Sequence, residues 1–299
     1  MRNRFHFSPL AAIAATALAG SVLAGCSSEG NDASGSDMIA TTNVWADVAS
    51  AVTGEDVDAI ITGDAVDPHH FEPSAKDLSR IKEADTVVAN GGAYDAALYT
   101  AAEQDRIIYA IPLLDEHDHE HEHGHAHMPD SLDEREHAWF APEKVLQVAE
   151  DIADRTGGDA SDVKQRIGEI QSTLNAVPHV HIGMTETIAA GLVWGTELHD
   201  ITPEEYVKAS LNHQEPSASA VAAFLEQIER GELDMLFVNP QSANSATQRL
   251  ADAAKAHNVP VVEIRETPPA GQNFLDYFQE IVGQITDIAA HAEPTDHHH

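Results

Sequence analysis

The stretch Asp159–Val177, DASDVKQRIGEIQSTLNAV, decides the fold of this 299-residue chain. It contains no proline, and Pro178 follows it directly. Asp159 and Ser161 stand where a helix cap is expected. The apolar residues recur at the spacing of one helix face: Val163, Ile167, Ile170 and Leu174. The pattern predicts a single long helix over 159–177 that joins the segments on either side.

Both flanking segments alternate short apolar runs with amphipathic stretches. The runs predict strands, which we place at 38–42, 57–62, 86–90, 106–111, 180–184, 235–239 and 259–264. The amphipathic stretches predict helices, which we place at 44–53, 75–84, 93–104, 217–230, 245–257 and 273–290. Because strands alternate with helices, we predict parallel βαβ units. The expected fold class is α/β, with two Rossmann-like lobes joined by one helix and a ligand cleft between the lobes.

The N-terminus has the features of an export signal. Arg2 and Arg4 precede an apolar stretch at 9–23 that is shorter than the ~20 residues of a membrane-spanning helix. We therefore predict a cleaved signal peptide over 1–25. Cys26, the single cysteine, follows small residues and resembles the lipobox of bacterial lipoproteins, which implies a diacylglycerol anchor on its sulfur. The alternative is an ordinary signal peptide cut just upstream, which leaves a free thiol.

Composition divides the remainder of the chain. Residues 26–37 are rich in Ser, Gly, Asn and acids, which predicts a flexible tether. We expect an N-terminal lobe over 38–158, a C-terminal lobe over 178–292 and a tail over 293–299. The protein is expected outside the cell, anchored to the outer face of the cytoplasmic membrane or periplasmic. Since no second cysteine is present, its stability must come from core burial.

The charge of the chain excludes one class of partner. The formal net charge is −34, and such an acidic chain would be repelled by nucleic acid.

A histidine-rich tract interrupts the N-terminal half within a loop predicted at 115–134. Imidazole binds borderline transition metals well, so the tract indicates a divalent metal. The alternative is a solvated low-complexity loop. Alternate positions of the tract are histidine: His117, His119, His121, His123, His125 and His127. The tract also matches the metalloprotease pattern H-E-x-x-H, but that motif requires a helix, and a charged repeat interrupted by Gly124 is not expected to form one. We therefore do not expect an enzyme.

Four better-placed candidates lie beyond the carboxyl ends of predicted strands. His69 stands between the prolines of Asp67–Pro73, a loop that proline stiffens, and His137 follows the histidine-rich tract. Glu186 and Glu266 directly follow predicted strands of the second half. Open α/β sheets bind ligands at this edge, so a cleft between the lobes could bring all four onto one ion.

The motifs that carry these histidines resemble a known family. The pattern Asp-Pro-His-x-aromatic-Glu-Pro at 67–73, the histidine-rich insertion and His137-Ala138-Trp139 are similar to the zinc- and manganese-binding receptors of bacterial ABC importers, the ZnuA/TroA-like family. The segments 41–48 and 88–92 also match. The resemblance implies two α/β lobes bridged by one rigid helix, with a metal ion held between them.

The resemblance also implies a ligand set. His69 and His137 match the first two ligands, and Glu186 stands where zinc receptors often have histidine and manganese receptors often have glutamate. Glu266 takes the place of the usual aspartate, with Glu263 as the fallback if the last strand slips. We expect the remaining histidines with no motif around them to be structural or at the surface: His179, His181, His199, His213 and His257.

Two imidazoles and two carboxylates form a closed set with no position for an activated water, which favours binding over hydrolysis. We therefore predict a metal receptor, expected to be a monomer, that delivers its ion to an ABC permease and its ATPase. The four ligands alone do not distinguish Zn²⁺ from Mn²⁺. The histidine-rich tract favours Zn²⁺, and we expect the tract to be an accessory element that collects the ion. Mn²⁺ is the alternative cargo, and a surface adhesin is the alternative function.

Overall fold

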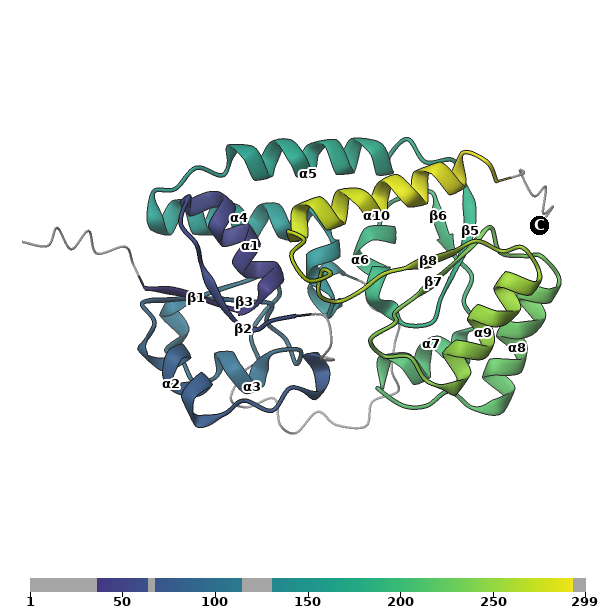
Figure 1. Ribbon diagram of the computed structural model, residues 1–299, viewed down its shortest axis with the longest axis horizontal. Helices are drawn as coiled ribbons and strands as arrows, with labels where there is room; N and C mark the ends of the chain where they lie inside the picture. Colours follow the sequence, from purple (N-terminus) through teal and green to yellow (C-terminus); the bar gives the residue numbers. More distant parts are fainter. Residues whose placement is uncertain (1–36, 64–67, 115–130, 293–299) are drawn as a thin grey trace, which may run out of the picture. The chain divides into compact units, whose positions relative to one another are not determined.

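Two parallel sheets with the same strand order form the frame of the protein (Figure 1). The computed structural model describes residues 37–63, 68–114 and 131–292. The predicted signal peptide, Cys26, the tether, the six histidines of the tract and the C-terminal tail lie outside these residues. The strands of the first sheet, in spatial order, are β2 (Asp58–Ile61), β1 (Met38–Thr42), β3 (Thr86–Ala89) and β4 (Ile107–Tyr109). Those of the second are β6 (Leu198–Asp200), β5 (Val180–Met184), β7 (Met235–Val238) and β8 (Val261–Glu263).

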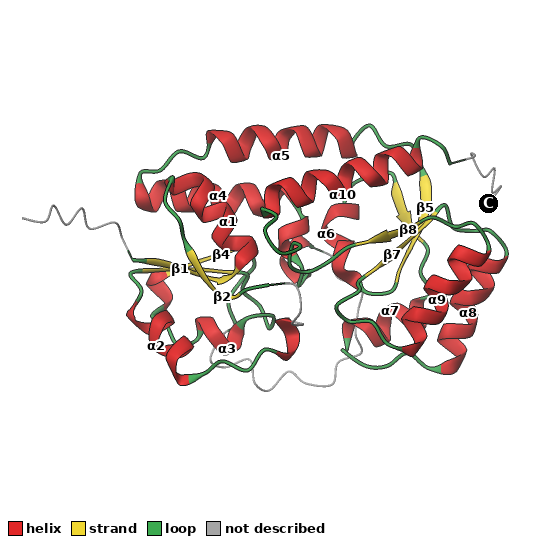
Figure 2. Ribbon diagram, viewed as in Figure 1, coloured by secondary structure: helices red, strands yellow, loops and turns green. Residues whose placement is uncertain are grey.

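The central strands are apolar because helices cover both faces of each sheet (Figure 2). All four residues of β3 and all four of β7 are buried. Every strand pair is parallel, with Val87 beside Ile107 in the first sheet and Ile182 beside Met235 in the second. The α/β fold class predicted from the sequence is confirmed, with two all-parallel sheets.

The helices follow the strands in the order that βαβ units require. Those of the N-terminal half are α1 (Asn43–Thr53), α2 (Ala75–Glu83), α3 (Ala96–Tyr99), α4 (Pro142–Thr156) and α5 (Ser161–Leu174). Those of the C-terminal half are α6 (Ala190–Val193), α7 (Glu204–Leu211), α8 (Ala218–Glu229), α9 (Ser245–Ala256) and α10 (Phe274–Ala289). Among the described residues, none of these helices has the length and apolar character that a bilayer crossing needs.

One hydrophobic core runs through both lobes beneath α5 and α10. It joins Val88 of the first sheet and Ile182 of the second to Phe278 of α10. The first turn of α10 is fixed to the N-terminal lobe, because the backbone N–H of Phe274 donates to the carboxylate of Asp47, 2.6 Å away. Both helices lie along the same side of the two sheets in Figure 1. The lobes are therefore joined by packing as well as by the chain.

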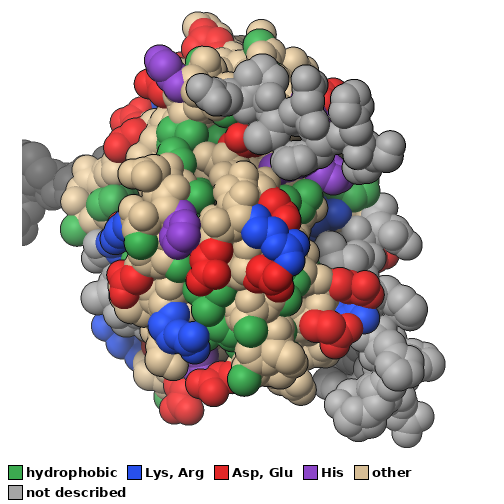
Figure 3. Space-filling model, turned by 90° about the vertical axis from the view of Figure 1, so that its right-hand side faces the viewer, with side chains coloured by type: hydrophobic (Ala, Val, Ile, Leu, Met, Phe, Trp, Pro, Cys, Tyr) green, Lys and Arg blue, Asp and Glu red, His purple; other side chains and the backbone are tan. Residues whose placement is uncertain are grey.

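The outer faces of the sheets have separate cores. Ile39, Ile81 and Leu98 belong to the core of the N-terminal outer face, and Phe224 and Leu250 belong to that of the C-terminal outer face. The end of the C-terminal lobe shown in Figure 3 carries acidic side chains interspersed with fewer basic ones.

Some elements differ from those expected. The helix predicted over 93–104 is wrong: only Ala96–Tyr99 is α-helical, and Gln104–Arg106 is a 3-10 turn. The carboxylate of Asp95 accepts the backbone N–H groups of Asn90 and Gly91, and it folds this segment back toward the end of β3. The joining helix is shorter than 159–177, because Asp159 accepts the N–H of Ser161 in a turn before the first helical residue. Strand β6 and helices α4, α6 and α7 were not expected.

Candidate metal centre

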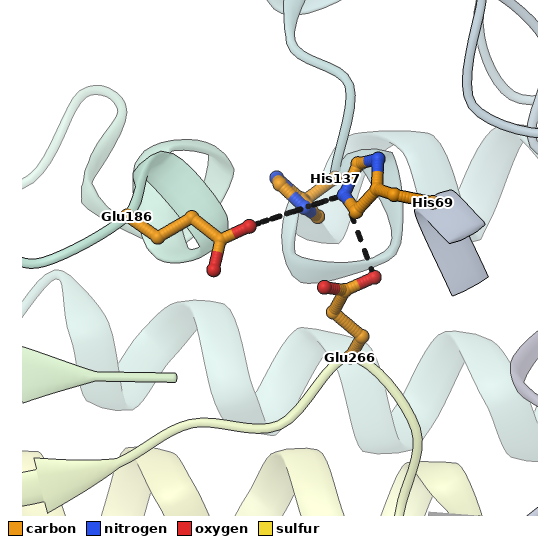
Figure 4. A group of neighbouring side chains, drawn as sticks. All are labelled: His69, His137, Glu186 and Glu266. Atoms are coloured by element: carbon orange, nitrogen blue, oxygen red, sulfur yellow. Dashed lines mark hydrogen bonds and ion pairs between the residues drawn. The ribbon is translucent and has the colours of Figure 1, made fainter. Parts of the chain in front are cut away.

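Four loops that follow strands bring the predicted ligands together. His69 lies in the 3-10 turn Pro68–His70 after β2, and His137 directly precedes the turn Ala138–Phe140 after β4. Glu186 follows β5 and Glu266 follows β8. Each of the four offers one ligand atom, and these atoms all lie within 4.8 Å of one another. The side chains converge from both lobes in Figure 4.

The distances between the ligand atoms are those of a small coordination shell. The Nε2 atoms of His69 and His137 are 3.3 Å apart, and His69 Nε2 lies 3.6 Å from Glu266 Oε2. Glu186 Oε1 lies 3.7 Å from His137 Nε2 and 3.9 Å from His69 Nε2. Bonds of about 2.0–2.2 Å to a tetrahedral ion separate its ligands by roughly 3.3–3.6 Å. The four atoms therefore need only small shifts to surround one ion.

The site is deep, and its burial increases from one residue to the next. The side chains of Glu186 and His69 are 16% and 12% exposed, whereas those of His137 and Glu266 are 4% and 0% exposed. When both imidazoles are neutral and both carboxylates are ionised, the set carries a charge of −2, which a divalent cation would cancel. A buried set of this composition favours a dehydrated divalent metal ion.

Uncharged donors orient the two carboxylates. Asn239 Nδ2 donates to Glu186 Oε2 over 2.7 Å and to Glu266 Oε1 over 3.1 Å. The hydroxyl of Tyr94 donates to Glu266 Oε2 over 3.0 Å, and that of Ser242 donates to Glu186 Oε2. These donors hold the carboxylates in place without cancelling their charge. Such partners of metal ligands commonly raise the affinity of a site.

Burial raises the pKa of the Tyr94 phenol well above its usual value, and the negative charge of Glu266 adds to the effect. Tyr94 therefore remains a neutral donor at any physiological pH. Burial, with a contribution from Glu186, likewise raises the pKa of Tyr206 to about 12.

The loops that carry the carboxylates are braced by a glutamine. Gln241 Oε1 accepts the backbone N–H of Glu266 over 2.8 Å, and Gln241 Nε2 donates to the hydroxyl of Thr267. Since Gln241 follows β7 and Glu266 follows β8, these bonds tie together two neighbouring strand ends.

Aromatic rings form the wall behind the histidines. The ring of Tyr94 lies edge-on to His69 at 5.0 Å and packs against Trp139 at 4.8 Å, measured between ring centroids. Trp139 also lies edge-on to His137 at 5.3 Å. Because Trp139 is 1% exposed and Tyr94 is 7% exposed, the imidazoles rest on a rigid apolar surface.

Two cavities reach the site. One of about 790 Å³ is lined by Glu136, Glu186, Trp194 and His213, among others. The other, of about 210 Å³, is lined by His69, Glu186 and His213. Solvent therefore reaches the ligand set past Glu186 and His213.

The structure brings His69, His137, Glu186 and Glu266 together as the sequence predicted, and their role as metal ligands stays a prediction. Glu263, the fallback for Glu266, is exposed at the end of β8 and is not in this group. The sequence did not assign roles to Tyr94, Asn239 and Ser242. Each of these residues lies in a segment that follows a strand. Polar residues are common there, so the sequence indicated a role in the site only weakly.

The five histidines that were expected to be structural or at the surface differ in their distance from the site. His179, His181 and His199 cluster on the second sheet, with ring centroids 5.3–5.7 Å apart, and His257 is exposed at the end of α9. His213 is also exposed, but its ring lies 5.1 Å from that of His69. The expectation that His213 has only a structural or surface role missed this proximity, because it lies in a loop after the unpredicted helix α7.

The chain is similar in fold to several solved structures. The periplasmic zinc-binding protein TroA from Treponema pallidum aligns with a TM-score of 0.61 and 17% identity, over 86% of this chain and 99% of that one. The Zn(II)-bound ZnuA-like domain of Streptococcus pneumoniae AdcA aligns with a TM-score of 0.56 and 16% identity, over 85% and 99%. A mutant of the laminin-binding adhesin Lmb from Streptococcus agalactiae aligns with a TM-score of 0.60 and 16% identity, over 85% and 100%.

The sequence itself identifies the family. No curated protein matches the chain significantly. The family described as "Zinc-uptake complex component A periplasmic", ZnuA, matches residues 38–288, which include both sheets and all four candidate ligands. The chain therefore belongs to the ZnuA family of metal-binding solute-binding proteins.

Proposed function

We propose that this protein is an extracytoplasmic zinc receptor that delivers its ion to an ABC permease. The observation that carries the proposal is the convergence of His69, His137, Glu186 and Glu266 on one point. Two nitrogen and two oxygen ligands at tetrahedral spacing suit Zn²⁺, whereas Mn²⁺ prefers more oxygen ligands. Family membership supports the permease as the partner, because the family is described as a component of a zinc-uptake complex.

The geometry favours carriage over catalysis. Four protein ligands complete a tetrahedral shell, so no open position remains for a water that the ion could activate. The ion is therefore the cargo of the protein and is exchanged whole.

The proposal includes the parts of the chain outside the described residues. We propose that residues 1–25 are removed on export, that Cys26 carries the lipid anchor and that the histidine-rich tract collects zinc for the site. We further propose that the protein is a monomer. Its N-terminal lobe, 38–158, and its C-terminal lobe, 178–292, hold the ion between them, and the segment 159–177 joins the two lobes.

Elemental analysis of the purified protein tests the proposal. We expect one high-affinity zinc ion per chain, retained against an excess of manganese, and lost in His69→Ala and in Glu186→Ala. His257→Ala is the matched control, because this histidine is exposed and lies outside the ligand group. Retention of the ion in both site variants would refute the site, and displacement of zinc by manganese would assign the manganese alternative.

An adhesin function is the second candidate. The structural similarity to the laminin-binding adhesin Lmb favours it over other non-transport functions. Binding of the zinc-loaded protein to immobilised laminin, compared with binding of the ion-free protein, tests it directly. The two functions are independent, since a metal receptor can also be displayed at the surface.

A further inference from the structure

The two ring nitrogens of His69 face two different groups of side chains. Its Nε2 atom faces His137, Glu186 and Glu266, as described above. Its Nδ1 atom lies 3.7 Å from Glu136 Oε1. The other carboxylate oxygen of Glu136, Oε2, lies 3.6 Å from His213 Nε2. His69, Glu136 and His213 thus form a second group whose ligand atoms all lie within 4.8 Å of one another.

The second group is more exposed than the first. The side chains of His213 and Glu136 are 59% and 25% exposed, whereas His69, which belongs to both groups, is 12% exposed. Exposure therefore falls continuously from His213 through Glu136 and His69 to Glu266. His213 also lines both cavities that reach the site. Among the described residues, this group is therefore the first part of the site that an ion arriving from solvent would meet.

We propose that Glu136 and His213 form an outer metal position that captures the ion and passes it through His69 to the buried site. This inference rests on the proposed function and adds a second coordination position to it. The outer group offers two imidazoles and one carboxylate and leaves room for water ligands, so an incoming ion loses only part of its hydration shell there. The buried site then replaces the remaining waters with Glu186, His137 and Glu266.

The shared imidazole makes the two positions alternatives for one ion. A neutral imidazole has one lone pair for a metal and carries its proton on the other nitrogen. When Nε2 binds the ion in the buried site, the proton is on Nδ1 and faces Glu136. When Nδ1 binds the ion, the proton is on Nε2. Transfer between the positions therefore requires a ring proton to move from one nitrogen to the other through solvent or a neighbouring carboxylate, and the stoichiometry remains one ion per chain.

An exposed His–Glu pair elsewhere in the chain provides a matched control. His179 Nδ1 lies 3.5 Å from Glu197 Oε2, and the two side chains are 60% and 66% exposed. This pair resembles His213 and Glu136 in chemistry and distance, but neither residue belongs to a group that includes a ligand of the buried site. A general effect of surface charge on ion capture would therefore appear at both pairs.

Stopped-flow mixing of the ion-free protein with Zn²⁺, followed by tryptophan fluorescence, tests the inference. In His213→Gln and Glu136→Gln we expect the association rate constant to fall by roughly tenfold, because each variant removes a ligand that holds the incoming ion at the outer position, and Glu136→Gln also removes a charge that attracts it. The dissociation rate constant should fall in parallel, because an intermediate position accelerates passage in both directions. The equilibrium affinity should therefore change little. His179→Gln and Glu197→Gln should bind at the wild-type rate.

The outcomes separate this inference from the proposed function. Unchanged rates in His213→Gln, with a wild-type protein that binds one zinc ion, would refute the outer position and leave the receptor intact. Faster dissociation with unchanged association would also refute it, since Glu136 would then only orient His69. A wild-type protein that binds no ion would overturn both.

Discussion

The N-terminal and C-terminal lobes have the same strand order, but they bring different chemistry to the site. In each sheet the spatial order is second, first, third and fourth strand. The N-terminal lobe contributes two imidazoles, His69 and His137, whereas the C-terminal lobe contributes two carboxylates, Glu186 and Glu266. The third strand of each sheet is followed by a buried asparagine, Asn90 in one lobe and Asn239 in the other.

The two asparagines show why the lobes differ. Neutral imidazoles do not repel each other, and in the N-terminal lobe Asn90 Nδ2 donates to the backbone carbonyl of Glu136, one residue before His137. Two neighbouring ionised carboxylates do repel each other, and in the C-terminal lobe Asn239 donates to both of them. In one lobe the asparagine positions the backbone that carries a candidate ligand, and in the other it stabilises two neighbouring carboxylates directly.

The largest expected effect comes from removing one ligand from either lobe. His137→Gln and Glu266→Gln should each lower zinc affinity on the order of 1000-fold, more than the 10–100-fold typical of residues that only orient ligands. Titration against a competing chelator measures the loss. Glu263→Gln, three residues before Glu266 and exposed, should bind as the wild type does. A loss in Glu263→Gln without one in Glu266→Gln would reverse the assignment.

The next effect concerns Asp95, a buried carboxylate of the N-terminal lobe that lies outside the ligand group. Burial raises its pKa to about 6, although Thr41, Asn90 and Gly91 donate hydrogen bonds to it. Because this pKa exceeds the ordinary aspartate value of 3.8, the folded state binds the proton more tightly than the unfolded state does. The resulting stability is complete below pH ~4 and is lost as the pH rises through 6.

Denaturant unfolding of the ion-free protein at several pH values measures this effect. Between pH 4 and pH 7, the unfolding free energy of the wild type relative to Asp95→Asn should fall by up to about 3 kcal/mol. Asp105→Asn, at an exposed position of the same lobe, is the control and should show no such trend. A difference that instead grows with pH would mean that the three hydrogen bonds outweigh the burial.

The smallest effects compare the two asparagines. Asn239→Ala should lower zinc affinity by roughly 10–100-fold, because both carboxylates lose a donor. Asn90→Ala should lower affinity less, but it should destabilise the protein by about 1–3 kcal/mol, because the part-buried carbonyl of Glu136 loses the hydrogen bond from Asn90. Zinc titration and thermal unfolding of both variants distinguish these cases. Equal losses of affinity would remove the distinction between the lobes.

The sequence predicted the frame well where a strand is buried along most of its length. The strands expected at 38–42 and 180–184 have those bounds, because their buried residues are flanked by clear breaks. Strand β6 was missed because it has three residues, of which only Leu198 is buried. Helix 93–104 was overestimated because side-chain hydrogen bonds of Asp95, which no periodicity reveals, fold that segment back on β3.

The candidate site was predictable as far as topology determines it. Parallel strands place their carboxyl ends at one edge, so residues after β2, β4, β5 and β8 were expected to meet. The partners of those residues were not predictable, because Tyr94 is 172 positions from Glu266 and their contact depends on how the two lobes pack. His213 was missed for the same reason, since its distance from His69 depends on the placement of α7.

The core shared by the two lobes determines how the ion can leave. Opening the lobes as a hinge would expose the apolar residues that join Val88, Ile182 and Phe278, at a cost of about 25 cal/mol for each Å². It would also break the hydrogen bond between Phe274 and Asp47. A hinge motion that separates the lobes is therefore costly in the isolated protein. We expect the isolated protein to exchange its ion slowly, through the cavities lined by Glu186 and His213, and we propose that rapid unloading needs a partner that supplies the energy of opening.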